Sequence, residues 1–88
     1  MENLLPNSTI FDLKGAIHFY EDENNRKLFM KELACATFEG CDIGLNSQQQ
    51  YISNWLHGKR LISVKIWHVR NISAFTGYPM EKLIQKKR

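Results

Sequence analysis

Along most of this chain, apolar residues recur at the spacing of amphipathic helices, and glycine, proline and asparagine interrupt that spacing at short intervals. The chain is therefore expected to fold as a series of short helices. Its 88 residues suit a single domain. A hydrophobic content of 43% with 24% charged residues is enough for a small core and carries no signature of disorder.

Five segments are expected to be helical. In chain order they are Ile10 to Phe19 or Tyr20, Arg26–Phe38, Gln48–His57, a segment from a Ser63 cap to about Thr76, and Met80–Lys86. Between them, the acidic run Glu21–Asn25 is expected to be a solvated turn, and Glu39–Asn46 contains two glycines that break any helix. Residues 1–8 are expected to form a flexible arm, and residues 87–88 a frayed tail.

Capping residues support these limits. Asn7, Ser8 or Thr9 suits the start of the first helix and Ser47 the start of the third. Gly58 is placed to stop the third helix in a left-handed conformation, and Gly77 to end the fourth. Pro79 suits the first turn of the fifth helix.

One stretch favours a different structure. Residues 62–66 alternate apolar and polar side chains and include β-branched residues, which is typical of a strand. Because Ile62, Ile66, Val69 and Ile72 would share one face of a helix, the helical interpretation is preferred.

Charge is divided unequally between the halves of the chain. Residues 1–45 carry four basic and eight acidic side chains, a net charge of −4, whereas residues 46–88 carry eight basic side chains and one acidic one, a net charge of +7. Such asymmetry indicates a polyanionic partner for the second half, with nucleic acid the leading candidate. The acidic half is expected to turn away from that partner.

Several classes of protein are not expected. There is no apolar run long enough to span a membrane, and the acidic start lacks the features of a secretory signal, so the expected location is the cytoplasm. Cys35 and Cys41 are too few for a disulfide framework or a zinc site and are expected to be buried or half-buried small residues. No phosphate loop, metal cluster or acid–base pair is visible, so neither enzyme activity, a small-molecule substrate nor a cofactor is expected.

The third helix divides into two faces. Tyr51, Ile52, Trp55 and Leu56 gather on an apolar face, and Gln50, Ser53, Asn54 and His57 gather on an uncharged polar face with Gln49 at its edge. Glutamine and asparagine amides both donate and accept, so they can pair with base edges in the major groove. The simpler alternative is a soluble helix face without a partner.

The context of that helix favours DNA. Lys59 and Arg60 follow it directly, and Lys65 and Arg70 lie on the next helix, where they can neutralise phosphates. A short polar-faced helix with a glycine stop, a basic loop and a short helix before it is typical of a DNA-binding helix-turn-helix.

The segment from Ser47 to Arg60, Ser-Gln-Gln-Gln-Tyr-Ile-Ser-Asn-Trp-Leu-His-Gly-Lys-Arg, resembles the recognition helix and turn of Cro/repressor-type regulators of phages and prophages, especially their YdaS-like branch. Thr76-Gly77 and Leu83 also resemble the family pattern, and the likeness covers about Leu28–Leu83. The resemblance implies an all-α, compact bundle of about five short helices, forming one helix-turn-helix domain. It implies sequence-specific regulation of transcription, such as repression, at a double-stranded DNA operator.

By this resemblance, Ile52, Trp55 and Leu56 are packing positions of the recognition helix. The residues expected to contact bases are Gln49, Gln50, Ser53, Asn54 and His57. The residues expected to contact phosphates are Arg26, Lys27, Ser47, Gln48, Lys59, Arg60 and Lys65. Arg26 and Lys27 belong to this set because they would stand at the start of helix two, whose free amides also attract phosphate.

The chain departs from the family in the link between helices two and three, which is longer by several residues. Either helix two continues to Gly40, or the turn is enlarged and Gly44-Leu45 takes the usual glycine-apolar position.

The fourth helix is expected to have a second apolar side, formed by Val64, Trp67, Ala74 and Phe75. Such a helix is buried in a bundle or uses its spare face for a partner. Val64, Trp67 and Phe75 are therefore the candidate face of a homodimer. The alternative function is a protein-interaction module, such as an antitoxin or adaptor, that binds its partner through the side around Trp67. RNA is a weaker third candidate, because the aromatic residues are expected to lie in the core.

Overall fold

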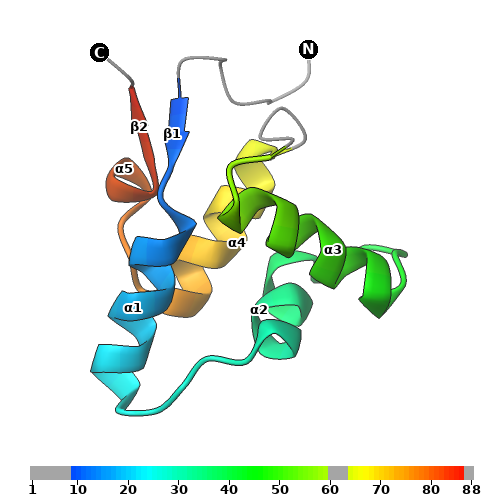
Figure 1. The fold of residues 1–88 in the computed structure, drawn as a ribbon, viewed down its shortest axis with the longest axis horizontal. Coiled ribbons are helices and arrows are strands. Elements are labelled where there is room, and N and C mark those ends of the chain that lie inside the picture. Colours follow the sequence, from blue (N-terminus) through cyan, green and yellow to red (C-terminus); the bar gives the residue numbers. More distant parts are fainter. Residues whose placement is uncertain (1–8, 60–63, 87–88) are drawn as a thin grey trace.

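The computed structural model describes residues 9–59 and 64–86. Its elements in chain order are β1 (Thr9–Phe11), α1 (Leu13–Asn24), α2 (Met30–Thr37), α3 (Leu45–Leu56), α4 (Ile66–Thr76), α5 (Met80–Leu83) and β2 (Ile84–Lys86) (Figure 1). The predicted arm, the predicted tail, Arg60 and the Ser63 cap lie outside the described residues. The compact, mostly helical fold is confirmed, and none of the described helices is long and apolar enough to cross a membrane.

A small antiparallel sheet joins segments near the two ends of the described chain. β1 pairs with β2 in the register Ile10 to Gln85 and Phe11 to Ile84. The predictions of helix at Ile10–Asp12 and at Ile84–Lys86, and of Thr9 as a helix cap, are therefore wrong. Pairing places the β-branched and aromatic side chains of β1 in the conformation that they favour, and it buries Phe11.

The helix α1 begins and ends later than the sequence predicts. Its cap is Asp12, whose Oδ1 accepts a hydrogen bond of 3.1 Å from the backbone N–H of Gly15. It continues through the acidic run, because acidic side chains are compatible with a solvated helix, and it ends at Asn25, whose φ is +50°. The prediction of a turn from Glu21 onward is therefore wrong.

A carboxylate organises the loop that follows. Glu21 Oε2 accepts a hydrogen bond of 2.8 Å from the backbone N–H of Leu28, so the chain stays non-helical until α2 begins at Met30. The opposite end of α2 is held by α4, since Asn71 Nδ2 donates to the carbonyl of Thr37 at 2.9 Å.

The residues before α4 are extended. Val64 and Lys65 are not helical, and Lys65 has φ −107° and ψ 161°. The strand-like pattern of this stretch was the better guide here, and the prediction that the helix includes Val64 and Lys65 is wrong. The predicted end of the helix at Gly77 is confirmed, and this glycine is left-handed, with φ +81°.

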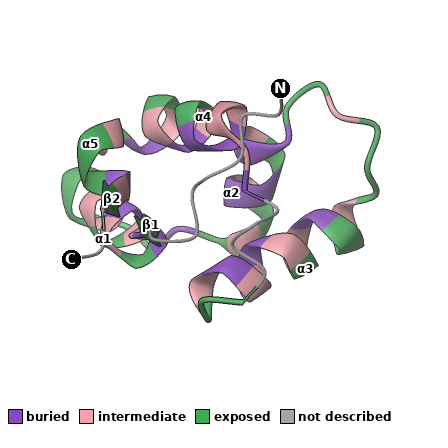
Figure 2. Ribbon diagram, turned by 90° about the horizontal axis from the view of Figure 1, so that it is seen from above, coloured by how far each residue is buried: buried purple, intermediate pink, exposed green. Residues whose placement is uncertain are grey.

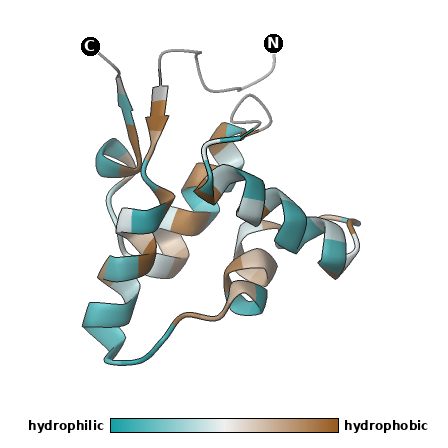
Figure 3. Ribbon diagram, in the orientation of Figure 1, coloured by the Kyte–Doolittle hydropathy of each residue, from teal (hydrophilic) through white to brown (hydrophobic). Residues whose placement is uncertain are grey.

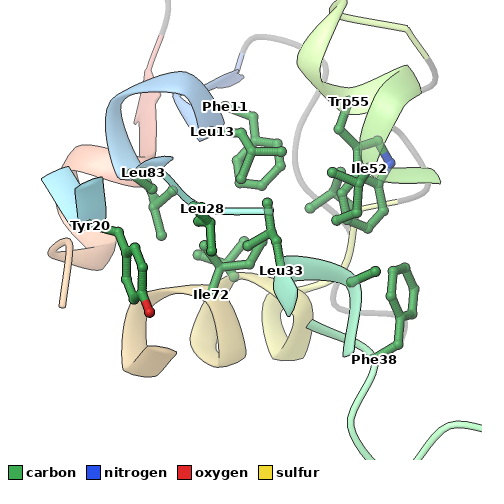
Figure 4. Packing of buried hydrophobic residues seen from close by; sticks show 14 residues of the cluster. Phe11, Leu13, Tyr20, Leu28, Leu33, Phe38, Ile52, Trp55, Ile72 and Leu83 are labelled. Atoms are coloured by element: carbon green, nitrogen blue, oxygen red, sulfur yellow. The ribbon is translucent and has the colours of Figure 1, made fainter. Parts of the chain in front are cut away.

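The core lies where α1, α2, α3 and α4 meet (Figure 4). Leu13, Leu33, Ile52 and Ile72 are at most 1% exposed. Tyr20 and Leu83 lie at one end of the cluster, and Trp55 and Phe38 lie at the other. Each of the larger helices therefore contributes an apolar face to one common core.

Candidate nucleic-acid interface

The helix α3 lies on the outside of the bundle, packed against α2 (Figures 1 and 3). Its apolar face is buried, with Ile52 at 0% and Trp55 at 2% exposure, as the sequence predicts. Leu56 and Tyr51 are half-buried against the core. None of the residues of α3 is charged.

An enlarged turn precedes α3. Helix α2 ends at Thr37, and after the buried Phe38 a mostly exposed connection, residues 39–44, leads to α3 (Figure 2). Gly44 caps α3, and Leu45 is its first residue. The second of the two predicted alternatives is therefore correct, and the prediction of Ser47 as the cap is wrong.

Gln48 has a structural task in this turn. Its side chain is 9% exposed, and its Nε2 donates to the carbonyl of Ile43 at 2.7 Å. The amide thus ties the first turn of α3 to the connection before it. Gln48, predicted to contact phosphate, therefore has its amide turned inward and bonded within the protein. Ser47 is exposed in the same turn.

The amides of the outer face of α3 are accessible. Gln50 is exposed, and Gln49, Ser53 and Asn54 are half-buried. Gln50 Nε2 donates to Asn54 Oδ1 at 3.3 Å. A pocket of about 220 Å³ lies beside this pair and is lined by Ser47, Gln50, Tyr51 and Asn54. The structure therefore brings the predicted base-contacting residues of α3 together.

The end of α3 adds a histidine and a lysine. His57 is exposed, and its Nδ1 lies 2.8 Å from the carbonyl of Ser53, to which it donates. Gly58 has φ +71°, so its left-handed conformation is confirmed. The backbone N–H of Lys59 donates to the carbonyl of Asn54 at 2.7 Å, which places the exposed Lys59 directly beyond the amide pair.

Arg26 and Lys27 do not stand at a helix start, because they lie in the loop before α2. Arg26 forms a bidentate ion pair with Glu32, at 2.9 and 2.8 Å, and also donates to the hydroxyl of Tyr20. This guanidinium holds the pKa of Glu32 below its usual value. The predicted use of helix-start amides here is therefore wrong, and a phosphate at Arg26 would have to compete with Glu32.

Carboxylates lie closer to α3 than the charge pattern predicts. Glu39 and Asp42 are exposed in the connection directly before α3. Two carboxylates of the acidic half therefore lie directly before α3, which the charge pattern alone did not predict. These charges disfavour a phosphate near the beginning of α3.

A second pocket, of about 270 Å³, lies between α3, the connection before it and the start of α4. We call it the aromatic pocket; it is lined by Phe38, Ile43, Tyr51, Trp55, Lys65, Trp67 and His68. Lys65, predicted to contact phosphate, is half-buried at this pocket as the cap of α4. This pocket was not predicted from the sequence, although aromatic residues are dense on either side of residue 60.

The predicted dimer face is partly internal, with Val64 buried and Trp67 and Phe75 half-buried. Val64 is 0% exposed, and the ring of Phe75 stacks on Tyr20 with centroids 5.0 Å apart. Trp67 is half-buried and contacts Phe38 edge-on. Val64 cannot belong to a free face, because its side chain is fully buried in the core. Of the two cysteines, Cys41 is half-buried as expected, but Cys35 is exposed, so its predicted burial is wrong.

His68 is a buried neutral base. It is 5% exposed, and its Nδ1 accepts the backbone N–H of Lys65 at 2.9 Å. Burial lowers the pKa of His68 from 6.5 to about 4, and the nearby charge of Lys65 acts in the same direction. At neutral pH the ring therefore carries its proton on Nε2.

Acidification is expected to destabilise the fold through His68. Between pH 6.5 and about 4 the unfolded chain binds a proton that the folded chain does not. The free energy of unfolding is therefore highest above pH 6.5, and it falls by about 2 kcal/mol as the pH drops through this range. Urea unfolding at both ends of the range measures the change. His68→Asn, which keeps an acceptor for Lys65 and does not titrate, should flatten it, whereas the exposed His18→Asn should not; equal slopes in all three proteins would contradict the assignment.

Comparisons of the chain with protein-family models, with curated proteins and with solved structures find no significant match.

Proposed function

We propose that this protein is a sequence-specific DNA-binding regulator of transcription of the Cro/repressor type, with α2 and α3 as its helix-turn-helix and α3 as the recognition helix. The observation that carries the proposal is the outer face of α3. That face holds accessible, uncharged hydrogen-bonding side chains and no carboxylate, and the exposed Lys59 follows it directly. A convex helix of this composition suits the major groove, where amides pair with base edges and lysine with phosphate.

The amide pair on α3 has complementary groups left for a base. Among the described residues, the side-chain amides of Gln50 and Asn54 form a side-chain hydrogen bond only with each other. It leaves Oε1 of Gln50 to accept and Nδ2 of Asn54 to donate. Adenine presents a donor, N6, and an acceptor, N7, side by side in the major groove. The pair therefore favours adenine at the position it contacts.

The charges around α3 indicate which part of the helix lies deepest in the groove. Glu39 and Asp42 precede its first turn, and Lys59 follows its last. Phosphates are repelled at the first end and attracted at the second. The half of α3 from Gln50 to His57 is therefore the part proposed to contact bases, which differs from a recognition helix that enters by its first turn.

Selection of bound sites from a random duplex pool tests the proposal. We expect an enriched sequence, and a palindrome would indicate a dimer on two half-sites. Gln50→Ala should weaken binding to that site by about 1–3 kcal/mol and relax the preference at one position, whereas Lys59→Ala should weaken binding to all sequences alike. Equal losses for both variants on every duplex would contradict base contact by Gln50.

Two matched variants serve as controls. Gln85→Ala removes an exposed amide from β2, and Lys14→Ala removes an exposed positive charge from α1. Neither should change binding to the selected site. If no sequence is enriched and a purified partner protein binds tightly instead, the protein-interaction alternative replaces the proposal.

A further inference from the structure

The aromatic pocket joins three parts of the fold that are separate in sequence. Tyr51 and Trp55 come from α3, Phe38 from the end of α2, and Trp67 and His68 from the start of α4. Its volume of about 270 Å³ lies just below the lower end of the usual range for small-molecule sites. It therefore suits a ligand of one ring system with a small substituent.

The pocket contains one unused buried donor. His68 is only 5% exposed, and its Nδ1 accepts a hydrogen bond from the backbone N–H of Lys65. No described residue forms a hydrogen bond with Nε2 of His68. In the described part of the chain, however, every fully buried side-chain nitrogen or oxygen has a hydrogen-bond partner. Nε2–H must therefore lie at the small exposed part of the ring. His68 also lines the aromatic pocket, so its Nε2–H is the donor that we infer to face a ligand there.

The remaining walls determine the shape of a ligand. Phe38 and Trp55 stack at an interplanar angle of 26° with centroids 5.7 Å apart, and Trp67 stands edge-on to Phe38 at 83°. Flat rings pack against such walls by offset stacking and edge contacts. Lys65 contributes a positive charge to the lining, whatever other group it contacts.

We propose that the aromatic pocket binds a small aromatic monocarboxylate, with the carboxylate accepting from Nε2–H of His68 and the ring lying among Phe38, Trp55 and Trp67. The donor and the charge of Lys65 offset the cost of burying the carboxylate. Because two of the walls belong to α3, an occupied pocket fixes α3 relative to α4. The binding itself does not rest on the proposed function, since it requires no DNA.

Benzoate is the probe that tests this site. The chain has two tryptophans, and both line the pocket, so the two indole N–H resonances of the ¹⁵N-labelled full chain report on it directly. We expect both resonances to shift and to saturate in about the millimolar range. Benzyl alcohol, which has the same ring without the charge, should bind about tenfold more weakly. No saturable shift, or equal binding of the two probes, would overturn the proposal.

Two variants test the contacts. His68→Asn retains an acceptor for the N–H of Lys65 but removes the Nε2 donor, and it should weaken benzoate about tenfold. Ile43→Glu places a negative charge at the exposed rim, where folding is not at risk, and should weaken benzoate but not benzyl alcohol. His18→Asn, exposed on α1, is the matched control and should bind as the unmodified chain does. Unchanged benzoate affinity in Ile43→Glu would contradict the site even if His68→Asn failed to fold.

Discussion

Trp55→Ala is expected to lower the free energy of unfolding by about 3–5 kcal/mol. The indole is 2% exposed and contacts the rings of Phe11, Phe38, Tyr51 and His68, so its removal leaves a cavity bordered by β1, α3, α4 and the residue that follows α2. A domain of this size has a total stability of only about 5–10 kcal/mol, so this single change removes a large share of it. Urea unfolding followed by circular dichroism measures the loss.

The second tryptophan is the control for this experiment. Trp67 is half-buried at the aromatic pocket, so Trp67→Ala removes less buried surface and should cost clearly less than Trp55→Ala. Both changes delete the same side chain. Equal losses of stability in the two variants would contradict the deeper burial of Trp55.

Gly15→Ala is expected to destabilise the protein by about 2–3 kcal/mol, even though alanine is the better helix former. A Cβ at Gly15 would clash with Oδ2 of Asp12 and lie 2.7 Å from the hydroxyl of Tyr78. The hydroxyl donates to the same Oδ2 at 2.8 Å, and this bond raises the pKa of Tyr78 above its usual value. The extra methyl group would therefore disturb both the cap of α1 and its link to the segment after α4.

Gly44→Ala provides the matched change. Gly44 has φ −61°, and nothing lies within 4 Å of a Cβ built there. Its replacement should change stability by less than about 1 kcal/mol, mainly through the weaker capping of α3 by alanine. Thermal unfolding of the two variants compares them. A Gly15→Ala protein that melts with the unmodified chain would contradict the close packing of Asp12 and Tyr78.

The sequence predicts well what depends on neighbouring residues. Helical spacing located the middle of each larger helix, and Gly58 and Gly77 adopt left-handed conformations near the ends expected for them. The division of α3 into an apolar and a polar face placed Ile52 and Trp55 in the core. These features are local, because the period of a helix and the freedom of glycine do not depend on distant parts of the chain.

Features that depend on distant partners could not be predicted in this way. The spacing of apolar residues in β1 predicts a helix. This segment is a strand instead because β2, at the other end of the described chain, pairs with it. The sequence indicates no partner for the charge of Arg26, whereas in the fold its guanidinium forms an ion pair with Glu32. Gln48 belongs to a run of three similar amides, and only the path of the enlarged turn decides that it points inward.

The β1–β2 pair also has a consequence for the order in which the chain folds. It closes a loop that contains all of the larger helices, and the entropy lost on closure grows with loop length. Two strands of three residues each offer few hydrogen bonds against that cost. The pair therefore becomes favourable only after the helices have brought its strands together. Its formation is a late step in folding, which stabilises a bundle of helices that has already formed.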